Sequence, residues 1–104
     1  MEHHLTKSEN NNSLSVHKGD TVMIELEETP TSGYMWNIAE INSAIAQLQS
    51  SNYELASPAM GGGGKRKFVF YITGPGNGSI SLKNLRQWSG DVAETFSVNL
   101  QCLN

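Results

Sequence analysis

Few side chains in this sequence are of the kinds that act as nucleophiles or as general acids and bases. The three histidines are His3, His4 and His17, and the first two lie in a polar N-terminal stretch. The single cysteine, Cys102, belongs to an alternating apolar segment, where a cysteine is most often a small buried hydrophobe. No pair of carboxylates shares a loop with a serine or histidine partner. We therefore expect no catalytic residue and no enzyme activity.

Residues that could bind a metal ion or a phosphate group are also few. His3 and His4 could hold a stray ion, but two adjacent ligands are too few for a protein zinc site. The glycine run at 61–64 precedes Lys65, yet the spacing and the following Ser or Thr of a phosphate-binding loop are missing. We expect no metal and no cofactor.

The residues best suited to binding lie in three short interruptions between apolar segments, and the first is Thr29-Pro30-Thr31-Ser32-Gly33. A hairpin needs only two residues. Pro30 fixes its φ near −65°, which removes ordering entropy before any partner binds. Thr31 and Ser32 offer small hydroxyls, and Gly33 can adopt the positive φ that turns the chain into the next segment. The stretch has the properties of a stiff, thin wedge, although a plain hairpin loop would also explain it.

The other two interruptions are Gly61-Gly62-Gly63-Gly64 and Arg86-Gln87-Trp88. Glycines let one backbone approach another closely and leave amides and carbonyls free to bond. Arginine with tryptophan on a polar loop is the composition of an interface hot spot. Simpler explanations stay open: a flexible linker for the glycines, and an Arg-Trp cation–π pair at the edge of the core for the third stretch.

The segments between these interruptions alternate in the manner of β-strands. Strands are predicted over residues 13–17, 21–26, 34–38, 52–56, 68–72 and 95–103, with another around Ile80 and Leu82. Leu85 falls out of phase, which predicts a bulge near Lys83 and Asn84. Residues 40–49 are predicted to be a loop with one helical turn. Trp36 lies in mid-strand and is expected in the core.

About seven short strands with frequent turns predict an all-β, immunoglobulin-like β-sandwich. Alternate strand junctions of a sandwich gather at the same end. The stretches 29–33, 61–64 and 86–88 each join two predicted strands, so we expect them to form one surface at one end of the sandwich.

A length of 104 residues suits one domain, with residues 1–12 as a disordered polar tail and 13–104 as the folded part. The net charge of −3 argues against nucleic-acid binding, and the short basic cluster Lys65-Arg66-Lys67 is interpreted as a solvated strand edge. No apolar run is long enough to cross a membrane. A single cysteine excludes an internal disulfide. We expect a monomer, cytoplasmic if Met1 is the native start.

In order and spacing, the three interruptions resemble those of the chagasin family of cysteine-protease inhibitors. That family carries Asn-Pro-Thr-Thr-Gly followed by an aromatic residue, then Gly-x-Gly-Gly, then Arg-Pro-Trp or Arg-Pro-Phe. Here Tyr34 is the aromatic residue, and the resemblance covers essentially the whole folded part. The chain departs from the family at Thr29, Ser32 and Gln87, where the family has Asn, Thr and Pro. We expect these departures to reduce affinity or alter target choice rather than abolish the activity.

The resemblance implies a chagasin-like inhibitor domain whose partner is a papain-like cysteine protease. Inhibition would be reversible and competitive, with three loops inserted into the active-site cleft. By this resemblance, residues 29–34 would block the catalytic centre, residues 61–64 would make backbone contacts along the cleft, and residues 86–88 would hold its flank.

An immunoglobulin-like adhesion or carbohydrate-binding module is the alternative. Trp88, Tyr34 and Tyr53 would then stack on a sugar. The polarity of 29–33 and 61–64 favours inhibition, because sugar sites usually gather several aromatic side chains.

Overall fold

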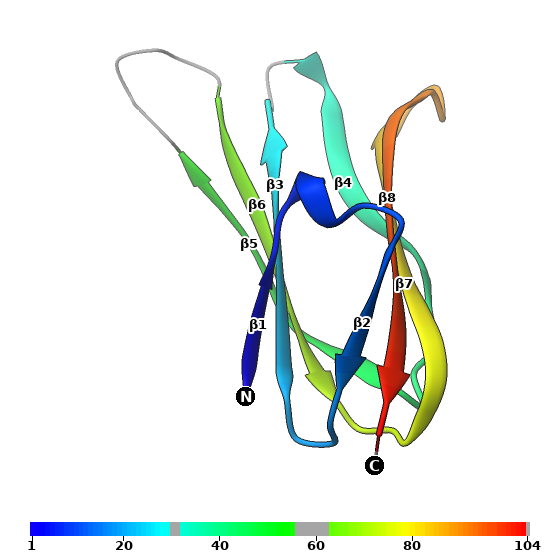
Figure 1. Ribbon diagram of the computed structural model, residues 1–104. Coiled ribbons are helices and arrows are strands. Elements are labelled where there is room, and N and C mark those ends of the chain that lie inside the picture. The colour runs from blue at the N-terminus through cyan, green and yellow to red at the C-terminus, as the bar shows by residue number, and fades with distance from the viewer. Residues whose placement is uncertain (30–31, 56–62, 104) are drawn as a thin grey trace.

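The chain folds as a two-layer β-sandwich, and the computed structural model describes its residues 1–29, 32–55 and 63–103 (Figure 1). The first sheet contains β1 (Glu2–Leu5), β3 (Thr21–Glu28), β5 (Ala46–Leu55) and β6 (Gly64–Ile72). The second contains β2 (Asn12–Val16), β4 (Tyr34–Ile41), β7 (Gly76–Arg86) and β8 (Val92–Cys102). The strand orders are β1-β3-β6-β5 and β2-β8-β7-β4. Only β1–β3 and β2–β8 are parallel among the described pairs.

Apolar side chains of alternate residues fill the space between the sheets. Val22, Ile24 and Leu26 of β3 are buried, as are Phe96, Val98, Leu100 and Cys102 of β8. Phe70 and Phe96 are the largest fully buried side chains, and Trp36 joins the same cluster with 5% of its surface exposed. The predicted sandwich is therefore confirmed, together with the inward faces of both strands and the core position of Trp36.

The prediction of a disordered tail over residues 1–12 is wrong. Residues 2–5 form β1, which pairs with β3 in the register Glu2 to Thr21 through Leu5 to Ile24. The 3₁₀ helix η1 (Lys7–Glu9) then crosses to the second sheet, where β2 begins. Two contacts hold this polar segment in place: Leu5 is buried, and His3 Nε2 lies 2.9 Å from Asp20 Oδ2. Backbone pairing leaves little signal in the sequence, so β1 was not predicted. With β1, the described residues form eight strands rather than about seven.

Residues 40–49 also differ from the prediction of a loop with one helical turn. Strand β4 continues to Ile41, and β5 starts at Ala46 and runs without a break to Leu55. The pairing of β5 with β6 shifts in register between Leu48 and Ser50. The one part of this stretch that resembles a helical turn is the connection before β5, where the Ala46 amide donates to the Asn42 carbonyl at 3.0 Å. The bulge predicted in β7 is confirmed, because its register with β8 shifts between Asn84 and Leu85.

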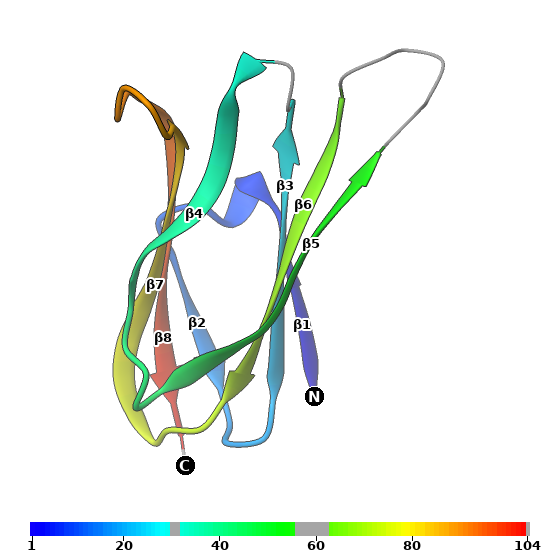
Figure 2. The ribbon, with the colours of Figure 1, turned by 180° about the vertical axis from the view of Figure 1, so that it is seen from behind.

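Three strands end and three begin at the same end of the sandwich, which we call the loop-bearing end. Strands β3, β5 and β7 end there and β4, β6 and β8 begin there (Figures 1 and 2). Strand pairing aligns these strand ends within each sheet: Gly64 lies opposite both Glu28 and Leu55, and Tyr34 lies opposite Arg86. No helix in the described part of the chain is long and apolar enough to cross a membrane.

Candidate functional site

The predicted binding residues that the structure describes all flank strand ends at the loop-bearing end (Figure 2). Pro30, Thr31, Gly61 and Gly62 lie outside the described residues, so their predicted roles stay predictions. The described ones are Thr29, Ser32, Gly33, Tyr34, Gly63, Gly64, Arg86, Gln87 and Trp88.

The first loop, residues 29–33, is closed by hydrogen bonds of Ser32. Its amide donates to the carbonyl oxygen of Thr29 at 3.0 Å, and its hydroxyl donates to the same oxygen at 2.6 Å. The amide of Tyr34 donates to Ser32 Oγ at 3.2 Å. Gly33 has a φ of +85°, the left-handed value that was predicted. The Ser32 hydroxyl was expected to face a binding cleft, but it also bonds within its own loop.

Trp88 belongs to the third loop and lies against the first. A Cβ added to Gly33 would come within 2.2 Å of Trp88 Cη2, so the ring covers the glycine closely. Trp88 nevertheless keeps 74% of its surface exposed. The predicted contact surface thus joins at least two of its three stretches, and Gly33 is required both for its φ and for this approach.

The Arg86 guanidinium lies near two aromatic rings, Tyr34 at the start of β4 and Trp88 in the third loop. Its Cζ lies 4.5 Å from the centre of the Tyr34 ring and 6.0 Å from that of Trp88, both within reach of a cation–π interaction. Among the described residues, no carboxylate lies within ion-pair distance of Arg86. Its charge is therefore free of an acidic neighbour in that part of the chain.

The third loop is closed by backbone hydrogen bonds rather than by a proline. The Arg86 amide donates to the Asp91 carbonyl at 3.0 Å, and the Gly90 amide donates to the Arg86 carbonyl at 2.7 Å. Gln87 is exposed. With glutamine in the place of the family's proline, the two backbone hydrogen bonds still close the loop, although glutamine leaves φ less restricted than proline does.

The two described glycines of the second loop differ in their surroundings. A Cβ on Gly64 would come within 2.3 Å of the Tyr53 hydroxyl oxygen and 2.4 Å of the Glu54 carbonyl oxygen. A Cβ on Gly63 would meet nothing within 4 Å. Gly64 is therefore needed for packing within the first sheet, and Gly63 is the one with open space above it.

Sequence reasoning missed a buried polar cluster beneath the loops. Glu28 is 3% exposed, and Arg66 Nη2 donates to Glu28 Oε2 at 2.9 Å while Arg66 Nε lies 3.2 Å from the same oxygen. The Trp36 amide donates to Glu28 Oε1 at 2.8 Å, and the Trp36 indole donates to the Glu27 carbonyl at 2.9 Å. Arg66 is thus no solvated edge residue, as had been predicted for its basic cluster.

A signal for this cluster was present in the strand pattern. Glu28 continues the inward parity of Val22, Ile24 and Leu26, and Arg66 has the inward parity of Phe68. Opposite charges at inward positions of two strands indicate a buried pair, because an unpaired buried charge costs several kcal/mol.

The three aromatic side chains that would stack on a sugar in the alternative function do not gather at one place. Tyr53 belongs to the first sheet and has the Arg66 guanidinium 5.7 Å from its ring centre, with its hydroxyl buried. Tyr34 and Trp88 both lie within reach of the Arg86 guanidinium instead. The aromatic residues therefore serve two separate clusters.

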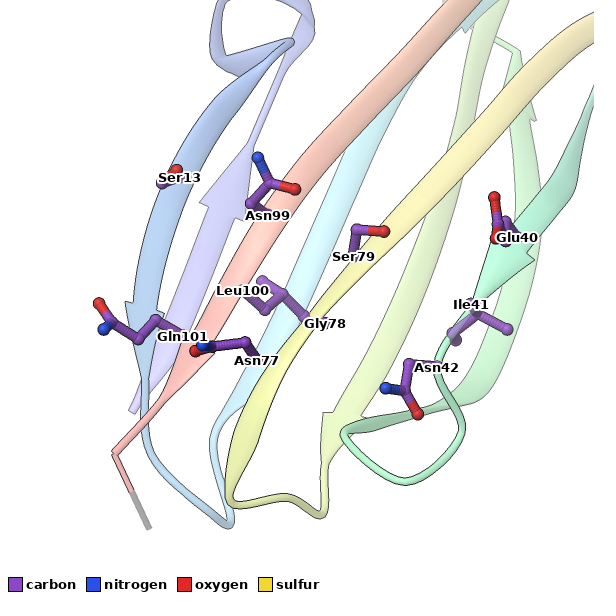
Figure 3. Close-up of a pocket in the computed structure, with 10 residues that line it drawn as sticks. All are labelled: Ser13, Glu40, Ile41, Asn42, Asn77, Gly78, Ser79, Asn99, Leu100 and Gln101. Atoms are coloured by element: carbon purple, nitrogen blue, oxygen red, sulfur yellow. The ribbon is translucent and has the colours of Figure 1, made fainter.

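A hollow of about 740 Å³ lies on the second sheet away from the loop-bearing end (Figure 3). Amide and hydroxyl groups supply most of its polar lining, and they come from Ser13, Asn42, Asn77, Ser79, Asn99 and Gln101. Its one titratable side chain is Glu40. Within the described ranges, no group of three or more His, Cys, Asp or Glu residues could hold a metal ion.

Comparison with known proteins gives one consistent result. The family model described as "Chagasin family peptidase inhibitor I42" matches residues 15–100. Chagasin from Trypanosoma cruzi is 28% identical over 108 aligned positions, which cover 97% of this chain and 98% of chagasin.

Solved structures show the same fold. The cysteine protease inhibitor EhICP2 from Entamoeba histolytica has a TM-score of 0.88 and 24% identity, with 97% of this chain and 95% of that chain covered. PbICP-C, solved in complex with falcipain-2, has a TM-score of 0.67 and 19% identity, with 98% of this chain and 89% of that chain covered.

Proposed function

This chain belongs to the chagasin family of peptidase inhibitors, and we propose that it inhibits papain-like cysteine proteases by filling their active-site cleft with its loop-bearing end. Relatives support the choice of target: EhICP2 is a cysteine protease inhibitor, and PbICP-C is bound to falcipain-2. One copy of the chain binds one protease reversibly and competitively. No cofactor takes part.

The observation that carries this proposal is the packing of Trp88 on Gly33. It holds the first and third loops together, while Trp88 stays 74% exposed. An exposed tryptophan packed against a second loop has less freedom to lose on binding than one that projects alone, which suits an interface anchor. Arg86 beneath it adds a charge for the flank of the cleft.

We expect the peptide bond after Thr29 to resist cleavage, because its carbonyl oxygen is already engaged within the loop. A protease must hold a scissile carbonyl about 3–3.5 Å from its nucleophile, in line for attack. It must also supply donors to that carbonyl's oxygen in the transition state. The Thr29 carbonyl oxygen already accepts two bonds from Ser32. It is therefore withdrawn from the attacking groups.

The departures from the family pattern adjust affinity. Thr29 lacks the side-chain amide with which asparagine can order its own loop, and here Ser32 supplies the closing bonds. Gln87 leaves the third loop to its backbone hydrogen bonds. We expect inhibition to persist with lower affinity or a different choice of target.

A protease panel tests the proposal. Papain, a serine protease and a metalloprotease are assayed with fluorogenic substrates at increasing inhibitor concentration, and only papain should lose activity, with KM raised and kcat unchanged. Mass spectrometry after overnight incubation with papain should find residues 29–33 uncut. Papain that stays fully active at micromolar inhibitor, or rapid cleavage within 29–33, would refute it.

A further inference from the structure

Three of the strands that flank the first and second loops meet at the Glu28 carboxylate, and the fourth adjoins it through Arg66. Glu28 ends β3 before the first loop, and Trp36 follows that loop in β4. Arg66 follows the second loop in β6, and Tyr53 precedes it in β5. Trp36 and Arg66 both bond to Glu28, and the Arg66 guanidinium lies over the Tyr53 ring. Since β4 belongs to the other sheet, the cluster also joins the two layers.

The bonds at Glu28 are directional and shielded from water. Its side chain is 2% exposed and that of Arg66 is 17% exposed. Oε1 accepts the Trp36 amide at 2.8 Å, and Oε2 accepts Arg66 Nη2 at 2.9 Å. Arg66 Nε lies between the two oxygens, 3.3 Å from Oε1 and 3.2 Å from Oε2. A guanidinium fork bound to a carboxylate fixes orientation as well as distance. The one carboxylate therefore ties the strand that follows the first loop to the strand that follows the second.

We propose that Glu28 is a positioning residue for inhibition, which sets the spacing between the first and second loops through Trp36 and Arg66. A buried ion pair adds little net stability compared with apolar side chains of similar volume. Apolar side chains at these positions would fill the core equally well. A carboxylate that accepts hydrogen bonds from both Trp36 and Arg66 also specifies where the bases of the two loops lie. This inference rests on the proposed function, because it assigns Glu28 a role in binding the same protease.

Glu28→Gln tests the role with little change in shape. The amide group would place its N–H donors against the donors of either Arg66 or the Trp36 amide, and the charge of Arg66 would lose its partner. The inhibition constant for papain should rise at least tenfold. The variant should also be cut slowly within or beside residues 29–33. In NMR spectra, the Trp36 amide should exchange faster with solvent.

A matched control separates positioning from stability. Ile72 is fully buried at the far end of β6, so Ile72→Val or Ile72→Ala can be chosen to match the fall in melting temperature without touching the loops. That control should inhibit papain like the wild type. Arg66→Lys keeps the charge but loses the fork, and it should fall between Glu28→Gln and the wild type.

Each outcome decides the matter. Equal inhibition by Glu28→Gln and the Ile72 control at equal melting temperature would overturn the positioning role, as would failure of both Glu28→Gln and Arg66→Lys to fold. Wild-type protein that leaves papain active would instead refute the proposed function. Inhibition of papain by the wild-type protein is therefore measured before the variants are compared.

Discussion

In the described part of the chain, one buried carboxylate lies at each end of the sandwich, and the two differ in what they fasten. At the loop-bearing end, Glu28 joins the strands on either side of two loops. At the opposite end, Asp20 accepts the His17 amide at 2.9 Å and lies 2.9 Å from His3 Nε2. That second carboxylate closes the turn between β2 and β3 and fastens β1 to it.

The comparison shows the same chemistry in two roles. Asp20 fastens a terminal strand, so its bonds serve the fold. Glu28 lies beneath exposed loops, so its bonds serve the shape of a surface. If this division holds, changes at the opposite end should alter melting without altering inhibition, and changes at the exposed loops should do the reverse.

The largest expected effect combines both, because Trp36 belongs to the core and to the Glu28 cluster. Trp36→Ala should lower the free energy of unfolding by roughly 3–5 kcal/mol, since it leaves a cavity and loses the indole bond to Glu27. Urea denaturation followed by circular dichroism measures this. A loss below about 1 kcal/mol would mean that the core does not depend on Trp36.

Trp88→Ala should do the reverse. Because its ring is exposed, the melting temperature should stay within a degree or two of wild type. Binding to papain should weaken by about 2 kcal/mol, roughly thirtyfold in the inhibition constant. Calorimetric melting and a titration of papain activity give both numbers. Equal falls of melting temperature for Trp88→Ala and Trp36→Ala would place Trp88 in the core and remove the contrast.

Asp20→Asn tests the opposite end through pH. Hydrogen bonds from His3 and the His17 amide lower the pKa of Asp20 well below its ordinary value. The stability that it contributes is thus fully present above the ordinary aspartate pKa of about 3.9 and is lost as the pH falls below that value. The gap in melting temperature between wild type and Asp20→Asn should stay nearly constant from about pH 6 down to about pH 4 and narrow as the pH falls further.

Inhibition by Asp20→Asn supplies the control for this prediction. At about pH 6, where papain can be assayed and Asp20 is ionised, the variant should inhibit as well as the wild type. A weaker inhibition constant would show that the opposite end also shapes the loops, and the division of roles would fail.

Gln87→Pro should have the smallest effect, and in the favourable direction. Proline restricts φ and the preceding residue, and Arg86 is already in a strand. The Gln87 amide takes no part in the two backbone bonds that close the turn. Affinity for papain should improve by about 0.5–1 kcal/mol, a few-fold in the inhibition constant. Weaker inhibition would mean that the turn needs a φ that proline does not allow.

The sequence by itself determined the features that depend on local chemistry. Alternation of apolar residues predicts β3, β6 and β8, because each has one face in the core and side chains of a strand alternate between faces. Gly33 and the residue types around it predict a turn with positive φ, because that preference belongs to the residue itself. The exposed position of Trp88 follows in the same way from its polar neighbours.

The tertiary structure alone decided the features that depend on distant partners. Strand β1 exists because its backbone finds the free edge of β3, and backbone groups are the same in every sequence. Trp88 reaches Gly33 only because β4 and β7 pair in one register, with Tyr34 opposite Arg86.

Glu28 meets Arg66 across 38 positions of sequence, and Trp36 reaches it from the other sheet. Parity along a strand can indicate that such charges face inward, but it does not name their partners. Pairing is fixed by the register and the packing of two sheets, which are properties of the whole chain.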